Sequence, residues 1–366
     1  MKKTLLLTHE YYPYKGGVAR YCYNLFKFLD QQEYWVVTDH AAVFAQNNII
    51  KLKLTNKFIR PVWLFSFFKL NKIIQQHQIK KIFTPNILPL GTMAYLINLL
   101  FKIPYIISLH GLDINLALKN KPELTNKILK NAEKIIVNSQ YTAKVIAPLR
   151  LSADKICLLY PSIDLKTEYD RNKLEDLKKK FKIQTEDKIL LTVGRLNRRK
   201  GQDLVIEAIN KLKSNFSLKY FIVGQGSLKE ELLKLIKKYK LTSQVFILED
   251  IDDQDLVYYY QLADIFVLPN RTNKTDVEGF GIVFLEAARC GLPIIAGQGG
   301  GVEEILTDQQ DALLVASDDL EQLIQNIQSL LNNPQKADKL AEQALVRAGD
   351  FPSASEQSLI LKRILG

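Results

Sequence analysis

The chain has 366 residues, of which 47% are hydrophobic and 24% are charged, a balance that excludes a globally disordered protein. Its length is too great for one ordinary core and predicts two α/β domains. The net charge of +11 is uneven, since residues 1–165 carry +13 and the remainder carries −2. A basic first half is typical of proteins that bind nucleic acid, an anionic membrane surface or an acidic substrate.

The apolar segments are too short or too interrupted to cross a membrane. An apolar run after Lys2 and Lys3 ends at His9, so residues 3–8 are expected to form a first β-strand rather than a signal peptide. The most apolar window, residues 87–109, is broken by two prolines and a lysine and predicts a buried helix followed by a strand. We expect a cytoplasmic protein without a transmembrane segment.

The cysteines and histidines predict neither disulfides nor a metal site. Cys22, Cys157 and Cys290 are few, far apart and odd in number, as in reduced cytosolic proteins. The four histidines have no Cys or His partner at the spacing of metal ligands. They are His9, His40, His77 and His110.

A glycine pair follows the first predicted strand. Gly16 and Gly17 come directly before a helix expected over residues 18–29. Glycines in such a loop let the backbone approach a phosphate closely, although a plain turn has the same composition. The pattern is not G-x-G-x-x-G, so the dinucleotide-binding fingerprint is missing.

Residues 57–81 predict a helix that is both aromatic and basic, with Pro61 in its first turn. An apolar stripe at helical spacing consists of Trp63, Phe67, Leu70 and Ile74. The residues that widen it or surround it with charge are Phe58, Phe65, Phe68, Arg60, Lys69, Lys72, Lys80 and Lys81. Two interpretations remain open, a helix packed in the core and a helix lying on an anionic bilayer. Nucleic acid is not an expected partner, because no nucleic-acid fold signature accompanies the charge.

Strands over residues 103–109, 134–137 and 156–162 are expected to complete the first half. His110 follows the first of these strands, and ligands bind at the carboxyl ends of strands in open α/β sheets. A single histidine in this place is also common as a structural residue. A lysine-rich helix over residues 172–182 opens the second half.

The second half repeats the alternation of strands and helices. Strands are expected over residues 188–193, 219–223, 245–248 and 263–269, with a helix over residues 202–212. Arg195 and Lys200 lie in the turn between the first strand and this helix. Cations combined with free N–H groups make an anion site, although such a basic turn is also typical of solvated surface. A last helix over residues 351–365 has Leu359, Ile360, Ile364 and Leu365 on its expected apolar side.

Residues 276–304 form the most informative stretch of the chain. A loop with Glu278, Gly279, Phe280 and Gly281 runs into an amphipathic helix that contains Glu286. Free N–H groups at the start of that helix can face an anion or hydroxyl groups. Two carboxylates in this arrangement can approach one polyol ligand from different sides.

This stretch resembles the E-x7-E signature of retaining glycosyltransferases of the GT-B fold, in the large family numbered four. Its wording, EGFGIVFLEAARCG, is most similar to the branch that contains bacterial phosphatidylinositol mannosyltransferases. The resemblance implies an α/β protein with two Rossmann-like domains whose parallel sheets face an interdomain cleft. Residues 1–165 would bind the acceptor, residues 166–350 would bind the donor, and residues 351–366 would return to the first domain.

The resemblance also implies roles for single residues. Arg195 and Lys200 would contact the donor's diphosphate, Glu286 the ribose hydroxyls, and Glu278 the sugar. His110 would orient the sugar or stabilise charge. The other donor-binding residues would be Gly16, Gly17, Gly224, Ile251, Gly279, Phe280 and Gly281. The chain departs from the family pattern at residues 161–164, which lack a glycine, and at Glu249-Asp250-Ile251, where the family commonly has a glycine before the residue whose backbone contacts the base.

The function implied by this resemblance is retaining transfer of a hexose, without a cofactor or metal. The expected donor is GDP-mannose, with a UDP-sugar as second choice, and the expected acceptor is a lipid or lipid-linked glycan. The site of action would be the inner face of the plasma membrane, an anionic surface that Arg60, Trp63, Lys69 and Lys72 would contact. Two alternatives are a soluble acceptor and a non-catalytic protein that binds nucleotide sugars.

Overall fold

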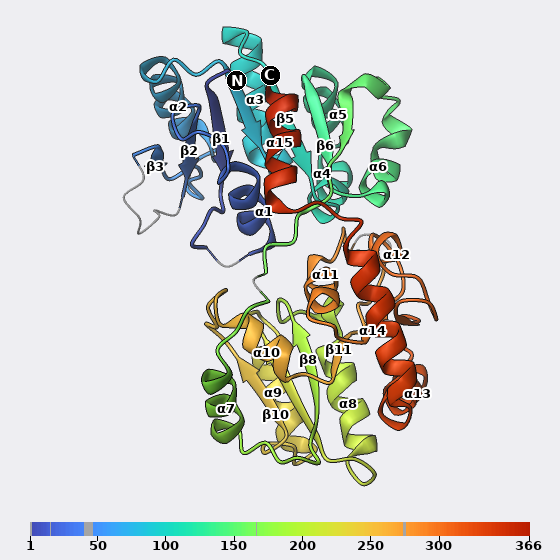
Figure 1. Ribbon diagram of the computed structural model, residues 1–366. Helices are drawn as coiled ribbons and strands as arrows, with labels where there is room; N and C mark the ends of the chain where they lie inside the picture. The colour runs from blue at the N-terminus through green and yellow to red at the C-terminus, as the bar shows by residue number, and fades with distance from the viewer. Residues whose placement is uncertain (1, 15, 40–46, 166, 274–275) are drawn as a thin grey trace. The chain divides into compact units, whose positions relative to one another are not determined.

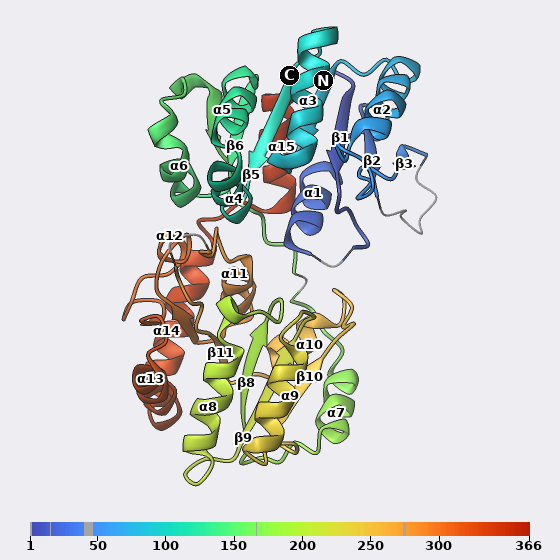
Figure 2. The ribbon, with the colours of Figure 1, turned by 180° about the vertical axis from the view of Figure 1, so that it is seen from behind.

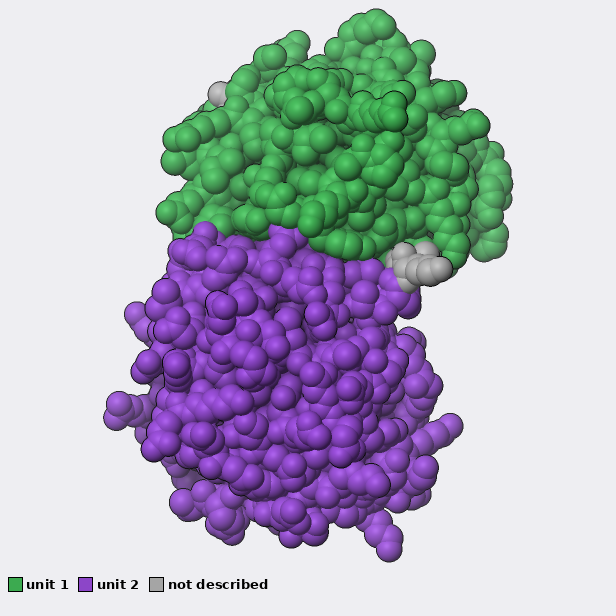
Figure 3. Space-filling model, turned by 90° about the vertical axis from the view of Figure 1, so that its right-hand side faces the viewer, with its two compact units in different colours: residues 1–164, 352–366 green, residues 165–351 purple. Residues whose placement is uncertain are grey.

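The computed structural model of the protein describes residues 2–14, 16–39, 47–165, 167–273 and 276–366. The chain forms two compact units, one made of residues 1–164 with 352–366 and the other of residues 165–351 (Figure 3). The boundaries expected from the sequence, after residues 165 and 350, differ from these by one residue each. His40 lies outside the described residues.

The first unit is built on a seven-stranded parallel sheet with the order β3-β2-β1-β4-β5-β6-β7. Its strands are β1 (Thr4–Thr8), β2 (Tyr34–Thr38), β3 (Ile49–Lys51), β4 (Lys81–Thr84), β5 (Tyr105–Leu109), β6 (Lys134–Val137) and β7 (Ile156–Leu158). Its α-helices are α1 (Gly17–Phe26), α2 (Leu64–Gln76), α3 (Thr92–Phe101), α4 (Leu112–Asn120), α5 (Pro122–Asn131), α6 (Gln140–Ile146) and α15 (Ala354–Leu365).

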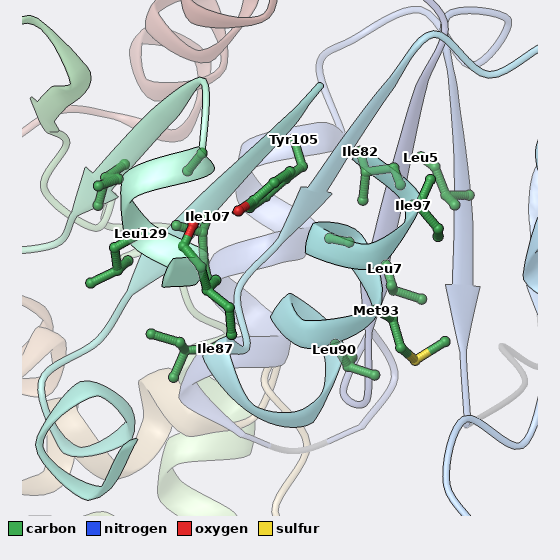
Figure 4. Packing of buried hydrophobic residues seen from close by; sticks show 14 of the residues in the cluster. Leu5, Leu7, Ile82, Ile87, Leu90, Met93, Ile97, Tyr105, Ile107 and Leu129 are labelled. Carbon is green, nitrogen blue, oxygen red and sulfur yellow. Dashed lines mark hydrogen bonds between the residues drawn. The ribbon is translucent and has the colours of Figure 1, made fainter. Parts of the chain in front are cut away.

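Helices cover both faces of this sheet, as its continuous apolar strands predict. On one face, Leu5, Leu7 and Ile107 pack with Met93 and other residues of α3 (Figure 4). On the other face, α1 and α15 pack against the sheet through a second cluster. The opposite views of Figures 1 and 2 show α15 on one side of the sheet and α3 on the other.

The C-terminal helix α15 belongs to the first unit, and its buried side differs from the expected one. Leu361 and Leu365 are fully buried, whereas Leu359 is 53% exposed and Ile360 is 37% exposed, so the prediction was wrong for these two residues. Polar residues occupy the buried positions instead. The Ser358 hydroxyl donates to the carbonyl of Asn24, 3.0 Å away in α1, and hydrogen bonding of this kind offsets the cost of burying a hydroxyl.

Helix α2 is shorter than predicted, because the chain before it forms a loop. The Asn56 N–H donates to the Val62 carbonyl at 2.7 Å, which closes residues 56–62 into a turn that contains Pro61. Arg60 and Trp63 therefore precede the helix instead of lying within it. The helix ends before Gln78, whose φ is +55°, and the chain then enters β4.

The second unit has a six-stranded parallel sheet with the order β10-β9-β8-β11-β12-β13. Its strands are β8 (Lys188–Val193), β9 (Leu218–Val223), β10 (Val245–Leu248), β11 (Ile265–Leu268), β12 (Ile294–Gly297) and β13 (Leu313–Val315). Its α-helices are α7 (Arg171–Lys180), α8 (Gln202–Leu212), α9 (Lys229–Lys238), α10 (Leu256–Leu262), α11 (Ile282–Arg289), α12 (Val302–Ile305), α13 (Leu320–Asn332) and α14 (Pro334–Ala348).

The two faces of the second sheet have different cores. Helices α8, α9 and α13 pack aliphatic residues against one face. On the other face, Phe266 of β11 contacts Tyr260 of α10 and Phe284 of α11, with ring centroids 5.9 Å and 5.8 Å away. This aromatic packing fixes α11, the helix that carries Glu286, against the sheet.

Candidate active site

The turn after β8 and the loop before α11 meet at the carboxyl edge of the second sheet. A one-turn helix (Arg198–Lys200) ends at Gly201, which has a φ of +70°. A Cβ at Gly201 would lie 2.4 Å from the Pro269 carbonyl, so only glycine lets the turn pack this closely on the chain after β11. The packing brings the cations of this turn beside the carboxylates of residues 276–278.

Lys200, Arg199 and Glu278 form a compact ion cluster. Lys200 Nζ and Arg199 Nη1 each lie 2.5 Å from the same Glu278 oxygen, Oε2. Arg199 Nε forms an ion pair with Asp276 Oδ1 at 3.0 Å, without the alignment of a hydrogen bond. The side chains of Lys200, Arg199 and Glu278 are only 9%, 13% and 13% exposed. Charge pairs with so little solvent around them interact strongly.

The electrostatics of the cluster keep Glu278 ionised. Burial by itself would raise the pKa of Glu278, but Lys200 and Arg199 outweigh this effect and lower the pKa to about 2. Burial is also the main cause of the lowered pKa of Lys200, and Glu278 opposes it. The cluster therefore holds Glu278 as a carboxylate between two cations.

A second network of hydrogen bonds, centred on Arg271, holds the turn that carries Arg198, Arg199 and Lys200. Arg271, which follows β11, pairs with both carboxylate oxygens of Asp203 at 2.7 Å and 3.0 Å. It also donates to the Arg198 carbonyl at 2.7 Å, and its backbone N–H donates to the Arg199 carbonyl at 2.6 Å. Bidentate pairing of this kind fixes geometry as well as charge.

Glu286 and Glu278 are held by different partners. Glu286 lies in α11, is 1% exposed, and accepts a hydrogen bond from the Tyr260 hydroxyl at 2.9 Å. Tyr260 is itself fully buried in α10. The sequence correctly placed Glu278 before the helix and Glu286 inside it, and the structure adds that the second carboxylate is almost completely covered.

The glycines of the predicted site serve the backbone geometry. Gly281 has a φ of +93°, and a Cβ there would lie 2.7 Å from the Phe284 ring. Gly224 has a φ of +147°, and a Cβ there would lie 2.1 Å from the Gly194 carbonyl. Phe280 is buried and packs edge-on against Phe351, with ring centroids 5.7 Å apart. These residues are required for local packing, and their contacts to a donor stay predictions.

Arg195 and Ile251 lie at the same edge of the sheet. Arg195 is exposed, and its backbone carbonyl accepts a hydrogen bond from the Gln202 side chain at 3.0 Å. Ile251 follows β10 and is half-buried, directly after Asp250, which has a φ of +59°. Gly279 lies in the loop before α11, and its carbonyl would be 2.3 Å from a Cβ at Gly301.

The carboxyl edge of the first sheet holds His110 among polar and aromatic side chains. The His110 ring lies edge-on to Tyr21 at 4.8 Å, and the Ser108 hydroxyl donates to the Tyr21 hydroxyl at 3.2 Å. The backbone N–H of His110 donates to Asp113 at 2.8 Å. Burial lowers the pKa of His110 to about 4 and raises that of Asp113 to about 6. The His110 imidazole is therefore neutral at pH 7.

The glycine pair of the first unit lies at the start of α1, as predicted. A Cβ at Gly16 would lie 2.9 Å from Glu10 Oε2, whereas a Cβ at Gly17 would meet no atom within 4 Å. Gly17 is exposed. The backbone is therefore open to a neighbour at Gly17 and crowded at Gly16.

The residues expected to face a membrane divide into two groups. Arg60, Lys69 and Lys72 are exposed. Trp63 is half-buried and packs on the core beside Phe67, with ring centroids 5.9 Å apart. The stripe of Phe67, Leu70 and Ile74 is buried, so this part of the predicted helix is core. The aromatic residues outside the stripe, Phe58, Phe65 and Phe68, are 96%, 61% and 66% exposed.

Three residues of these sites were missed by the sequence interpretation. Arg199 lies in the basic turn but was not distinguished from its neighbours. Tyr260 gave no signal, because an aromatic residue in a helix is usually core. Asp113 follows His110 by three residues, a spacing typical of a capping carboxylate, and this signal was available.

Three further findings concern the described residues as a whole. No helix within them is long and apolar enough to span a membrane. In the same part of the chain, no group of three or more His, Cys, Asp or Glu side chains is arranged to hold a metal ion. All three cysteines are free thiols.

Comparison with known proteins shows what class of protein this is. Residues 174–347 match the model of glycosyl transferases group 1, and residues 15–167 match that of glycosyltransferase family 4. A GDP-mannose-dependent alpha-(1-6)-phosphatidylinositol monomannoside mannosyltransferase of Mycolicibacterium smegmatis is 24% identical over 352 residues, covering 91% of this chain and 90% of that protein. An uncharacterized glycosyltransferase of Methanocaldococcus jannaschii is 27% identical over 345 residues, covering 92% and 91%.

A solved structure has the same fold as this chain. Anabaena HepE, in complex with UDP and glucose, aligns with a TM-score of 0.84 at 18% identity and covers 100% of this chain and 99% of its own. Two parallel-sheet α/β units of this kind define the GT-B fold, which confirms the predicted fold class. The chain belongs to the glycosyltransferases, with a family 4 domain in its first half and a group 1 domain in its second.

Proposed function

We propose that the protein transfers a hexose, with retention of configuration, from a nucleotide sugar to a lipid or lipid-linked glycan, without a metal ion. The observation that carries this proposal is the mostly buried cluster of Lys200, Arg199 and Glu278 beside the loop into α11. A fixed cation with little solvent around it, here Lys200, stabilises the charge that develops on a leaving diphosphate. A carboxylate beside it accepts hydrogen bonds from sugar hydroxyls.

In the proposed reaction, an acceptor hydroxyl forms a bond to the anomeric carbon on the face from which the diphosphate departs. The bond between that carbon and the diphosphate oxygen breaks, and the diphosphate takes the electron pair and the acceptor's proton. Lys200 and Arg195 stabilise the departing charge, Glu278 orients the sugar, and Glu286 binds the ribose. No side chain acts as a nucleophile, so positioning and electrostatic stabilisation lower the barrier.

The remaining donor contacts are proposed from the family resemblance. In the second unit they are Gly224, Ile251, Gly279, Phe280 and Gly281. In the first unit they are Gly16, Gly17 and His110, and the neutral state of His110 supports hydrogen bonding to a sugar hydroxyl. GDP-mannose is the first choice of donor because the mycobacterial relative is named for it, and a UDP-sugar is the second.

A lipid acceptor is supported by the surface of the first unit and by the name of the same relative. Exposed cations at Arg60, Lys69 and Lys72 accompany the exposed rings of Phe65 and Phe68. Cations attract an anionic bilayer, and aromatic rings enter its interfacial region. We therefore place the reaction at the inner face of the plasma membrane.

The test of the proposed donor is a screen of purified protein with GDP-, UDP- and ADP-sugars, without added metal. Thermal stabilisation by one nucleotide class, with slow release of its nucleoside diphosphate, is the expected result. A repeat with added EDTA should leave the release rate unchanged. A folded protein that is stabilised by no nucleotide sugar would contradict the proposal, and a rate abolished by EDTA would contradict metal independence.

A further inference from the structure

Arg199 is a second cation on a carboxylate that already has one. Its Nη1 and Lys200 Nζ converge on Glu278 Oε2, each at 2.5 Å. Its Nε is paired with Asp276 Oδ1 at 3.0 Å, and the side chain is 13% exposed. Arg199 thus ties Glu278 and Asp276 together from the turn after β8.

The charges indicate why one cation is not enough once a donor binds. The diphosphate of a nucleotide sugar brings negative charge, and Lys200 is proposed to meet it. Lys200 then has to divide its interaction between this diphosphate and Glu278. A carboxylate with little solvent around it is strongly destabilised when its only counter-charge is withdrawn.

Arg199 is placed to supply the missing counter-charge. A guanidinium stays charged and presents several N–H donors in one plane, so it reaches Glu278 and Asp276 at the same time. The backbone of Arg199 is fixed as well, because its carbonyl accepts the Arg271 N–H at 2.6 Å. Lys200 has a single ammonium at the end of an unbranched side chain and lacks the planar set of N–H donors that Arg199 has.

We infer that Arg199 is a positioning residue of the donor site, which neutralises and holds Glu278 so that Lys200 is available to the donor's diphosphate. The inference rests on the proposed function and adds a residue to it. Arg199 itself does not contact the diphosphate, which distinguishes it from Lys200 and Arg195. Without Arg199, Glu278 becomes a competitor of the donor for Lys200.

The test measures binding of a nucleoside diphosphate by calorimetry to the unchanged full chain and to five variants of it. The probe is whichever of UDP, GDP and ADP the unchanged protein binds most tightly. Arg199→Met should raise its Kd roughly tenfold, which corresponds to about 1.4 kcal/mol. The double variant with Arg199→Met and Glu278→Gln should bind within about threefold of Glu278→Gln alone, because no carboxylate then competes for Lys200.

A matched control lies one residue away. Arg198 is in the same turn but is exposed and pairs with Glu231 and Asp203, so Arg198→Met should leave the Kd within about twofold. Arg199→Lys is a further variant, because it keeps the positive charge but lacks the planar guanidinium with its several N–H donors. It should weaken binding less than Arg199→Met and be rescued in the same way, and it replaces Arg199→Met if circular dichroism shows that variant unfolded.

The outcomes separate this inference from the proposed function. Binding by Arg199→Met equal to that of the unchanged protein would overturn the inference. So would weakened binding that Glu278→Gln does not rescue, since Arg199 would then act on the diphosphate or on the fold. If the unchanged protein binds none of the three nucleoside diphosphates, the proposed function fails instead.

Discussion

Two carboxylates at the carboxyl edges of the two sheets have pKa values shifted in opposite directions. Asp113 in the first unit and Glu278 in the second are both largely covered, and burial by itself raises the pKa of each. Glu278 has two cations within 2.5 Å, and its pKa falls to about 2. Asp113 is held by backbone N–H groups, which do not offset burial, and its pKa rises to about 6.

This difference teaches how one fold makes two kinds of site. Parallel sheets bring loops to the same edge in both units, so the place of a ligand site is set by topology. Its chemistry is set by whether cations are built into the loops. Under the proposed function, the second unit, with Arg199 and Lys200 there, receives the anionic diphosphate, whereas the first, with the neutral His110 and Tyr21, receives uncharged hydroxyl groups.

The largest effect is expected from removing the buried ammonium of Lys200 at the carboxyl edge of the second sheet. Lys200→Ala should lower turnover by roughly 100-fold or more, the scale of losing one preorganised charge contact. Arg195→Ala is expected to act in the same direction at an exposed position. Initial rates with the best nucleotide sugar measure both effects, and Lys179→Ala on α7 is a control at a lysine that is 79% exposed. Turnover within threefold in both variants would remove these residues from the diphosphate site.

The next largest effect is expected at Glu286, which the structure covers almost completely. If it binds the ribose, Glu286→Ala should weaken binding of the nucleoside diphosphate by roughly 10- to 100-fold, as expected for a hydrogen bond to a charged group. Tyr260→Phe removes the hydroxyl that donates the 2.9 Å hydrogen bond to Glu286 and should have a smaller effect. Calorimetry and thermal unfolding are measured together. A lower melting temperature with an unchanged Kd would assign Glu286 to the core.

A third prediction tests the exposed lysines of α2, in the first unit, as a membrane-binding surface. Lys69→Glu with Lys72→Glu should weaken binding to anionic vesicles at least tenfold, because each cation near such a surface contributes about 1 kcal/mol. The matched control is Lys179→Glu with Lys180→Glu, at exposed positions of α7 in the second unit. Flotation with vesicles is the measurement. Equal loss in both pairs would indicate only net charge, and no loss in either would leave α2 without a membrane role.

The sequence predicted the fold well wherever apolar runs end at glycines or polar turns. The expected bounds of β6, β8, β10 and α8 coincide with the observed ones. The local hydrophobic pattern failed where tertiary contacts determine which side of a helix is buried. In α15, Gln357 and Ser358 take buried positions because they hydrogen-bond Tyr160 and the end of α1. The hydrophobic pattern had assigned the neighbouring Leu359 to that side.

The site could be predicted in part for a similar reason. Glu278 and Lys200 were selected from motifs, and the structure brings them together. Arg199 could not be distinguished from Arg198, because a run of cations does not show which one turns inward. That depends on the +70° φ of Gly201 and on the carbonyl of Pro269 beneath it, which no local pattern encodes.

The smallest effect is expected at the carboxyl edge of the first sheet, where the free energy of unfolding at different pH values tests Asp113 and His110. Asp113 has a folded-state pKa of about 6, above an unfolded value of about 3.9, so its contribution to stability is lost as the pH rises between these values. His110 has a folded-state pKa of about 4, below an unfolded value of about 6.5, so its contribution is lost as the pH falls through the same range. The two effects oppose each other in the unchanged protein. Asp113→Asn should therefore become more stable relative to it from pH 4 to pH 6, by roughly 1–2 kcal/mol in urea unfolding. His110→Gln should show the opposite slope, and parallel curves for both variants would mean that neither group is perturbed by burial.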